Sequence, residues 1–231
     1  MVTLAFVPTL VGALVGYALL GRDLMLGLRP PDFSDAGVIV SYVLVMVISL
    51  AIYGVTVALL VQLAYDVKIG RRGAIAGYIG PAMAAAVPIG VLGLVAGILT
   101  GLAAIALVIP GLWVYAVFSV MPPAVVIDKV GFGGLGRSAA LTKDYRWPIL
   151  GAILLIWIIT GVLGYLTGYV NNLLLAGTGF GGVGVTIYLI IDALFNAIFG
   201  GLGGILVALI YARLREIKEG VSVSDLVAVF D

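Results

Sequence analysis

Asp192 and Asn196 are the residues whose types and spacing most clearly suggest chemistry. Asp192 is the only carboxylate within any segment that we expect to cross a membrane, and Asn196 follows four residues later on the same helix face. A carboxylate inside a bilayer is costly, so such residues commonly serve an ion, a proton or a pore. The alternative hypothesis is structural: Asp192 lies within two turns of the outer surface, where it is hydrated or hydrogen-bonds a neighbouring helix.

The other residues offer little chemistry. The chain contains no cysteine and no histidine, which removes thiolate ligands, the commonest metal ligand and the usual proton shuttle at neutral pH. Three acids on one loop, Asp23, Asp32 and Asp35, are balanced by Arg22 and Arg29. We therefore expect no catalytic residue, no cofactor and no metal site, and a protein that is not an enzyme.

The composition is typical of a membrane protein. Of the 231 residues, 63% are hydrophobic and 10% are charged, whereas soluble domains average about 25% charged residues. The net charge is +1, so the overall charge does not suggest nucleic acid as a partner. The long uncharged runs favour an all-α polytopic fold with six transmembrane helices and short interfacial helices. We expect one transmembrane domain over residues 1–214 and a short cytoplasmic tail over residues 215–231.

The six spans are predicted from uncharged runs, because about 20 helical residues cross a 30 Å hydrocarbon layer. They cover residues 2–21, 36–65, 89–109, 112–127, 147–170 and 183–212. Glycines spaced four residues apart, at Gly12 and Gly16 and again at Gly93, Gly97 and Gly101, predict faces for close helix packing.

Prolines and glycines predict where helices end. Pro88 should separate residues 74–87, which either span or lie at the interface, from the third span. The chain should reverse at residues 109–111 (Ile-Pro-Gly), and Pro122 and Pro123 should kink or end the fourth span. Further predictions are a short interfacial helix from about Leu135, a glycine-rich loop over 171–182 and a final short helix capped by Ser222 or Ser224.

Lysine and arginine are unevenly distributed. The even-numbered loops and the tail hold all of them except Arg22 and Arg29. The positive-inside rule then places both termini in the cytoplasm, with the protein in the cell membrane. The basic residues of two loops are also candidate contacts for anionic lipid head groups: Lys68, Arg71, Arg72, Lys129, Arg137, Lys143 and Arg146. Alternatively, Asp128, Lys129, Asp144 and Arg146 pair with one another as a structural clasp.

Residues 103–147 carry a family resemblance. The Ile-Pro-Gly turn is followed by an aromatic-rich short helix, by Pro-Ala-Val-Val-Ile-Asp, and by Arg-Ser-Ala-Ala-Leu-Thr-Lys over residues 137–143, before Trp147. This order resembles a broad group of multipass prokaryotic membrane proteins that includes the membrane domain attached to some glycerophosphodiester phosphodiesterases. The stretches Gly-Tyr at 16–17 and Arg-Pro-Pro-Asp-Phe at 29–33 look like an archaeal family of uncharacterised membrane proteins. The resemblance implies topology and no activity, because the phosphodiesterase chemistry resides in a separate soluble domain.

The sequence is consistent with two functions. The preferred hypothesis is a non-enzymatic scaffold or lipid-interacting subunit whose partners are membrane lipids, a second copy of the chain or a membrane complex. The alternative is a small transporter or channel that uses Asp192 and Asn196. The two differ in one structural feature: a transporter should have a polar cavity that reaches Asp192, whereas a scaffold should be packed dry there.

Overall fold

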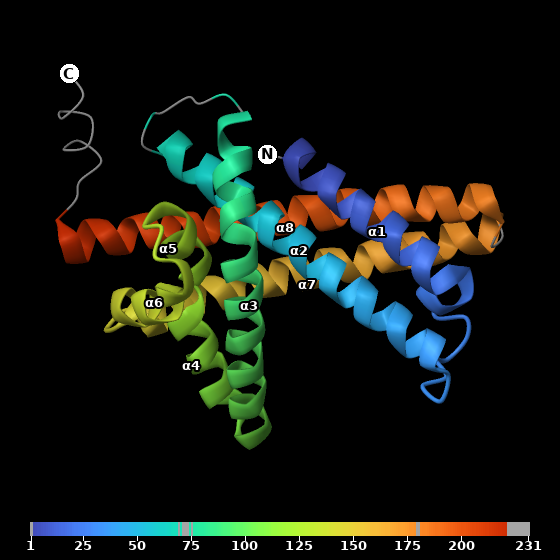
Figure 1. Ribbon diagram of the computed structural model, residues 1–231, viewed down its shortest axis with the longest axis horizontal. Coiled ribbons are helices and arrows are strands. Elements are labelled where there is room, and N and C mark those ends of the chain that lie inside the picture. The colour runs from blue at the N-terminus through green and yellow to red at the C-terminus, as the bar shows by residue number, and fades with distance from the viewer. Residues whose placement is uncertain (1, 69, 71–73, 75, 179–180, 221–231) are drawn as a thin grey trace.

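The computed structural model describes residues 2–68, 70, 74, 76–178 and 181–220, and these residues are helical apart from short connections (Figure 1). The elements in chain order are α1 (Val2–Met25), α2 (Ala36–Lys68), α3 (Ala76–Ala106), α4 (Val108–Phe118), α5 (Met121–Ile127), the single 3₁₀ turn η1 (Gly131–Gly133), α6 (Gly134–Thr142), α7 (Arg146–Thr178) and α8 (Gly182–Glu219).

Six segments of the described chain are long and apolar enough to cross a membrane: α1, α2, α3, α4 together with α5, α7 and α8. Large apolar side chains cover much of the surface; Ile105 is 84% exposed and Tyr165 is 77% exposed. Such a surface is costly in water and suits lipid. The predicted all-α polytopic fold is therefore confirmed, and the chain is a multipass helical membrane protein.

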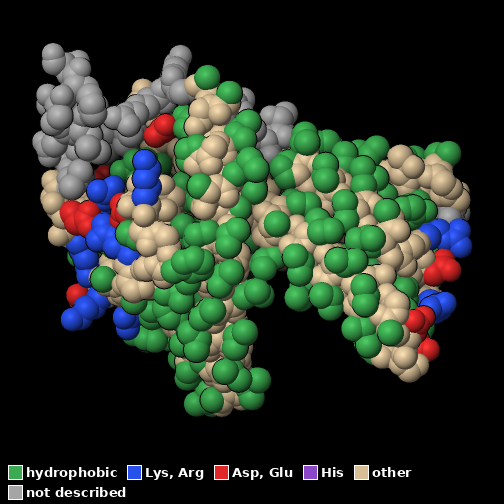
Figure 2. Space-filling view, in the orientation of Figure 1, with side chains coloured by type: hydrophobic (Ala, Val, Ile, Leu, Met, Phe, Trp, Pro, Cys, Tyr) green, Lys and Arg blue, Asp and Glu red, His purple; other side chains and the backbone are tan. Residues whose placement is uncertain are grey.

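The long helices form two limbs (Figures 1 and 2). Helices α7 and α8 lie along the long axis of the molecule, and α1 packs against both α8 and α2. The α3–α4 hairpin crosses this direction and packs against α2 through α3. Figure 2 shows a notch between the two limbs, with hydrophobic side chains over both and charged side chains gathered at two opposite ends of the molecule.

The two main core clusters meet at the short helix α5. Val125 of α5 packs with Ala58 of α2 and Ile89 of α3. Ala124, on the next position of α5, belongs to a second cluster with residues of α6, α7 and α8, among them the fully buried Tyr211. Helix α5 therefore joins the α2–α3 pair to the α7–α8 pair.

Two buried hydroxyls fix α6 against the end of α4. Ser138 and Thr142 are fully buried, and their Oγ atoms donate hydrogen bonds to the Val117 carbonyl at 2.7 Å and 3.2 Å. The last carbonyls of a helix have no partner within that helix. Because Ser138 and Thr142 are four residues apart, one face of α6 presents both hydroxyls to this carbonyl. The predicted short helix near Leu135 is thus confirmed, and its position at the membrane interface stays a prediction.

The predicted helix ends at prolines were wrong. Helix α3 continues through Pro81 and Pro88, so residues 74–87 do not form a separate helix. The reversal after α3 lies at Leu107, and Pro110 belongs to the first turn of α4. Pro122 and Pro123 begin α5 and do not end the fourth span. That span consists of α4 and α5 with a break at Ser119 and Val120, so the predicted alternative of a kink is confirmed. A proline is tolerated in the first helical turn because its missing N–H would have no partner there.

Three helices are also longer than predicted. Helix α1 continues to Met25, with a kink at Gly21 where φ is 75°. Helix α7 extends to Thr178 through most of the predicted glycine-rich loop, and α8 extends past Ala212 to Glu219. Polar residues in the α7 extension bond to their own helix: Thr178 Oγ1 donates to the Leu174 carbonyl at 2.6 Å. The predicted cap at Ser222 or Ser224 lies outside the described residues.

The predicted glycine packing is found at Gly12, where a Cβ would lie 3.5 Å from Ile52 Cδ1 of α2, but not along α3. At Gly93, Gly97 and Gly101, no atom of the described chain lies within 4 Å of where a Cβ would be. At Gly54 of α2, that position is 2.7 Å from the Ala86 carbonyl oxygen of α3. The glycine repeat of α3 therefore faces away from the other helices, and Gly54 marks the closest approach of α2 and α3.

This contact predicts opposite outcomes for two matched substitutions. Gly54→Ala should lower the free energy of unfolding by roughly 1–3 kcal/mol, the usual cost of overpacking. Gly97→Ala should leave it unchanged or raise it slightly, because alanine favours helix by about 1 kcal/mol and meets no neighbour. Thermal unfolding of the two variants in detergent measures the difference. Equal melting temperatures would contradict the α2–α3 packing.

Candidate functional site

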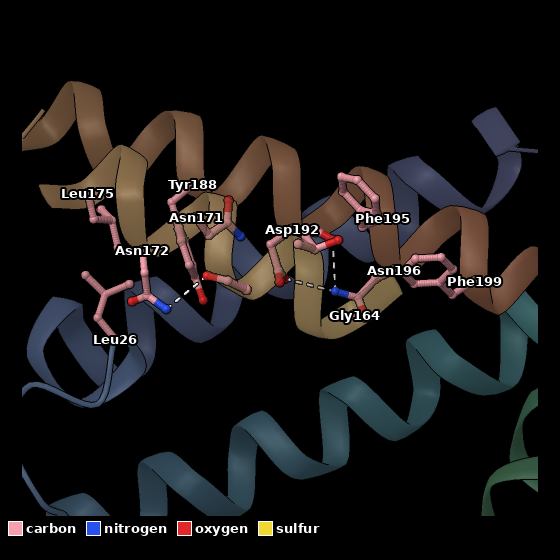
Figure 3. A pocket seen from close by; sticks show the side chains of 12 residues that line it. Leu26, Gly164, Asn171, Asn172, Leu175, Tyr188, Asp192, Phe195, Asn196 and Phe199 are labelled. Atoms are coloured by element: carbon pink, nitrogen blue, oxygen red, sulfur yellow. Dashed lines mark hydrogen bonds between the residues drawn. The ribbon is translucent and has the colours of Figure 1, made fainter. Parts of the chain in front are cut away.

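A polar pocket with a volume of about 310 Å³ lies between α7 and α8 and reaches Asp192 (Figure 3). Helix α8 contributes Tyr188, Asp192 and Asn196, which are spaced four residues apart and so share one helix face. The polar residues from α7 are Thr167, Asn171 and Asn172; the other lining residues are Leu26, Gly164, Gly168, Leu175, Phe195 and Phe199. The region around Asp192 therefore contains a pocket with polar side chains in its lining.

Asp192 and Asn196 contact each other directly, as their spacing predicts. Asn196 Nδ2 donates to Asp192 Oδ2 at 3.0 Å and to the Asp192 backbone carbonyl at 2.9 Å. The Asn196 amide therefore orients the Asp192 carboxylate and donates one of the hydrogen bonds that the carboxylate accepts. Asp192 lines the pocket, and its Oδ1 has no protein hydrogen bond in the described part of the chain. Asp192 thus keeps acceptor capacity for a ligand.

Asn171 is a pocket residue that the sequence did not predict. Its side chain is 4% exposed, and its Oδ1 is buried without a hydrogen-bond partner in the described structure. A buried unsatisfied acceptor costs about 1–3 kcal/mol, so such an atom requires an explanation. Its neighbour Asn172 is exposed and donates to the Gly168 carbonyl at 2.9 Å. The pattern of polar residues four apart, Thr167 and Asn171, was the available signal, but residues 171–182 were expected to form a loop.

Asp192 lies almost three turns from the start of α8, and its distance from the outer surface stays a prediction. Helix α8 begins at Gly182, so Asp192 is about 15 Å along the helix at 1.5 Å per residue. Leu26, which follows α1, also lines the pocket. The pocket is therefore near the end of the molecule that carries the α1–α2 connection.

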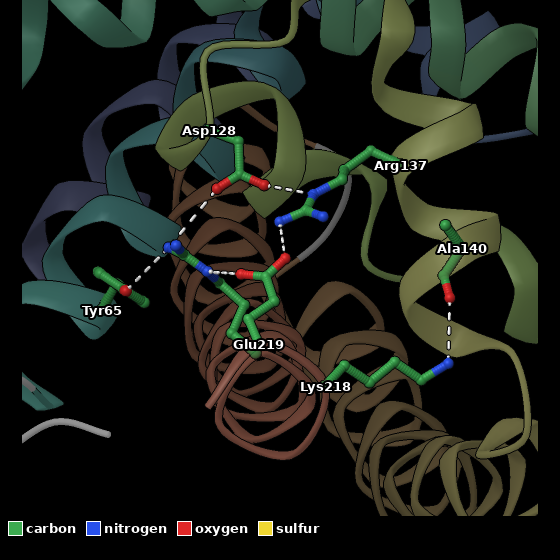
Figure 4. Close-up of polar contacts among 7 residues, drawn as sticks. Tyr65, Asp128, Arg137, Ala140, Lys218 and Glu219 are labelled. Atoms are coloured by element: carbon green, nitrogen blue, oxygen red, sulfur yellow. Dashed lines mark hydrogen bonds and ion pairs between the residues drawn. The ribbon is translucent and has the colours of Figure 1, made fainter. Parts of the chain in front are cut away.

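A second polar region occupies the opposite end of α8 (Figure 4). Asp128 Oδ2 accepts a hydrogen bond from Arg137 Nε at 2.6 Å, and Asp128 Oδ1 lies 3.5 Å from Arg215 Nη1. Glu219 in turn pairs with both arginines, at 2.9 Å from Arg215 Nε. Arg215 also donates to the Tyr65 hydroxyl at 3.3 Å. We call Asp128, Arg137, Arg215 and Glu219 the clasp.

The clasp has different members from those predicted. Asp128 pairs with arginines of α6 and α8, and Asp144 lies 3.7 Å from Lys218, so the expected pairing among residues 128, 129, 144 and 146 is wrong. The missing partners come from the end of α8, which was expected to be a polar tail. Burial alone would lower the pKa of Arg137, but its hydrogen bonds to Asp128 and Glu219 raise the pKa above its ordinary value. Arg137 therefore stays charged within the clasp.

The candidate lipid contacts divide into three groups. Lys68 pairs with Glu216 at 2.8 Å and Arg137 belongs to the clasp, so both have protein partners. Arg71 and Arg72 lie outside the described residues. Lys129, Lys143 and Arg146 form no ion pair within the described chain, and the Arg146 guanidinium lies 5.5 Å from the centre of the Trp113 ring. Among the described candidates, this third group has its charge available to a head group.

The acidic side chains at the end of α1 and in the α1–α2 connection bond to residues close to them in the sequence. Asp23 pairs with Arg22 at 3.0 Å. Asp32 accepts hydrogen bonds from the hydroxyl and the backbone N–H of Ser34, and these bonds lower the pKa of Asp32. Asp35 accepts from the Gly37 N–H at 2.7 Å and caps the start of α2. Within the described residues, no three acidic side chains come together as a metal site.

Comparison of the chain with protein-family models, with curated proteins and with solved structures gave no match. The resemblance to prokaryotic multipass membrane proteins thus stays a prediction. The class that the structure itself defines is a helical, multipass membrane protein with a polar pocket between its last two spans.

The clasp predicts that replacement of one aspartate lowers the free energy of unfolding strongly and that replacement of another hardly changes it. Asp128→Asn should lower the free energy of unfolding by roughly 1–3 kcal/mol, because its side chain is 13% exposed and bonds charged groups. Asp144→Asn should change it by less than about 0.5 kcal/mol, because that side chain is 71% exposed and its ion pair is long. Thermal unfolding in detergent compares the two. A loss of stability in Asp144→Asn equal to that in Asp128→Asn would show that the clasp is no stronger than a surface pair.

Proposed function

We propose that the protein is a small cation transporter of the cell membrane, and that its solute binds in the α7–α8 pocket. The observation that carries this proposal is the polar cavity at Asp192, the feature by which a transporter differs from a dry scaffold. Ionisable residues within membrane spans commonly mark a solute or ion pathway. Pockets between the helices of a membrane bundle are also where such proteins bind solutes.

The electrostatics of the pocket favour a cation. Its lining includes one carboxylate, Asp192, and no lysine or arginine. The basic residues of the clasp lie at the other end of α8, about 30 Å away at 1.5 Å per residue, where they are paired with acids. At low dielectric the Asp192 charge acts strongly on a nearby cation and disfavours an anion.

The distribution of charge supports an orientation with both termini in the cytoplasm. The end of the molecule that carries the clasp holds eight of the described lysines and arginines: Lys68, Lys129, Arg137, Lys143, Arg146, Arg213, Arg215 and Lys218. The other end holds Arg22 and Arg29. The positive-inside rule assigns the more basic end to the cytoplasm, and the pocket then opens near the outer surface.

This orientation predicts the outcome of cysteine labelling, which the chain permits because it has no native cysteine. Leu28→Cys, at a side chain that is 48% exposed in the α1–α2 connection, should react with a membrane-impermeant maleimide on intact cells. Gly136→Cys, on the exposed side of α6, should react only after permeabilisation. Labelling of Gly136→Cys on intact cells, with protection of Leu28→Cys, would reverse the orientation.

A scaffold or lipid-interacting subunit is the second candidate, and one observation favours it. Lys129, Lys143 and Arg146 lack ion-pair partners within the described chain, and Trp113 and Trp147 pack edge to face beside Arg146, with ring centres 5.2 Å apart. Tryptophan and basic side chains are enriched together at membrane interfaces. This arrangement suits an anionic head group, but it also suits a transporter that is anchored at the same interface.

The proposed function is tested by substitution of Asp192. Purified protein in proteoliposomes should carry a monovalent cation from a panel of sodium, potassium and methylammonium, measured with a potential-sensitive dye. Asp192→Asn should abolish this flux and leave the melting profile unchanged, because the amide keeps the shape of the side chain and removes its charge.

Asp23→Asn is the matched control. Asp23 lies near the same end of the molecule but outside the Asp192 pocket, and its side chain is 55% exposed. Cation flux through the Asp23→Asn variant should equal that through the unsubstituted protein. Absence of cation flux from the unsubstituted protein, or an Asp192→Asn variant that loses stability and not flux, would refute the transporter in favour of the scaffold.

A further inference from the structure

We propose that the α7–α8 pocket binds an organic primary ammonium ion with a short alkyl chain, in preference to a bare alkali cation. This inference rests on the proposed function, since it names the ligand class of the same pocket. It is drawn from four features of the lining: its charge, its volume, its aromatic rings and the unpartnered acceptor on α7.

Charge and volume together limit the ligand. The single carboxylate of Asp192 balances one positive charge, and the other polar lining residues are neutral. A volume of about 310 Å³ is roughly ten times the share of one water molecule in the liquid, which is about 30 Å³. A bare alkali ion would fill only a small part of this space. A monovalent cation that carries an organic group suits both limits.

The aromatic rings of α8 favour an ammonium group. Tyr188 precedes Asp192 by one helical turn, and Phe195 and Phe199 follow it by about one and two turns on the same side of α8. The rings of Phe195 and Phe199 are adjacent, with centres 5.6 Å apart. Ring faces attract organic ammonium ions, and carboxylates within aromatic surroundings are a recurring site for them.

Asn171 supplies the specificity for N–H groups. Its buried, unpartnered Oδ1 belongs to α7, and Asp192 with its free acceptor capacity belongs to α8. Figure 3 shows both side chains in the space between the two helices. A primary ammonium ion has three N–H donors and can bond to Asp192 and, once the Asn171 side chain turns to expose its shielded Oδ1, to Asn171, whereas a quaternary ammonium ion has no N–H donor. The orphan acceptor of Asn171 therefore selects a primary amine.

The apolar part of the lining accommodates an alkyl chain. Leu26 and Leu175 line the pocket together with the phenylalanines. Leu175 is 6% exposed, so it presents a fixed apolar wall one turn beyond Asn171. A short alkyl group that is bonded to the ammonium nitrogen would lie against this wall and leave the charged end at Asp192.

Binding to purified protein in detergent tests the proposal, with n-butylammonium as the probe and isothermal titration as the measurement. n-Butylammonium should bind at least tenfold more tightly than sodium, potassium or tetramethylammonium. Asp192→Asn should remove measurable binding. Asn171→Ala should weaken it about tenfold, the usual effect of losing one hydrogen bond to a charged group. Phe199→Leu should weaken it about threefold through the lost ring face.

Phe132→Leu is the matched control, because Phe132 is 61% exposed and lies outside the pocket. It should bind n-butylammonium as the unsubstituted protein does. Sodium or potassium binding that depends on Asp192, with no binding of n-butylammonium, would overturn this inference and leave the proposed cation transporter standing. Tetramethylammonium that binds as tightly as n-butylammonium would overturn the role of Asn171. Failure of every cation in the panel to bind would overturn both proposals.

Discussion

The arrangement of the helices depends on polar contacts and close backbone packing, because lipid supplies little hydrophobic drive between apolar helices. The clasp is the largest such contact in the described structure. Asp128, at the end of α5, accepts from Arg137 of α6 and lies beside Arg215 of α8. Helix α5 belongs to both main apolar clusters, so the clasp fixes the point where the α2–α3 pair and the α7–α8 pair meet.

Hydropathy predicted the fold class and the number of apolar helices correctly, because hydrocarbon and water sort side chains strongly. It predicted the helix ends poorly. Pro110, Pro122 and Pro123 were assigned to the ends of helices, and they belong to first turns, where the missing N–H costs nothing. Pro88 lies inside α3 without ending it. A proline shows that a helix boundary is nearby, but its residue type alone does not show on which side the helix lies.

The sequence also predicted one half of the candidate site. Asp192 and Asn196 were identified because a carboxylate stands out in an apolar span and the spacing of four fixes their contact. Asn171 could not be identified in the same way, because residues 171–182 were expected to be a loop. The clasp was missed for a related reason: Arg215 and Glu219 were assigned to a tail, whereas α8 continues through them. In both cases a helix continued through polar residues that were assigned to a loop or a tail, and the partners of Arg215 and Glu219 come from distant parts of the chain.

Several polar side chains of α7 form hydrogen bonds within their own helix. Thr160, Thr167 and Asn172 donate to carbonyls of their own helix one turn earlier, and so need no partner from another helix. Asn171 differs from them, because its buried Oδ1 accepts nothing, and Asp192 differs because it adds a charge. Both residues lower stability in the described structure, and leucine at either position would pack without that cost. The proposed ammonium ligand would offset both costs at once, which is the reason to consider the two residues together.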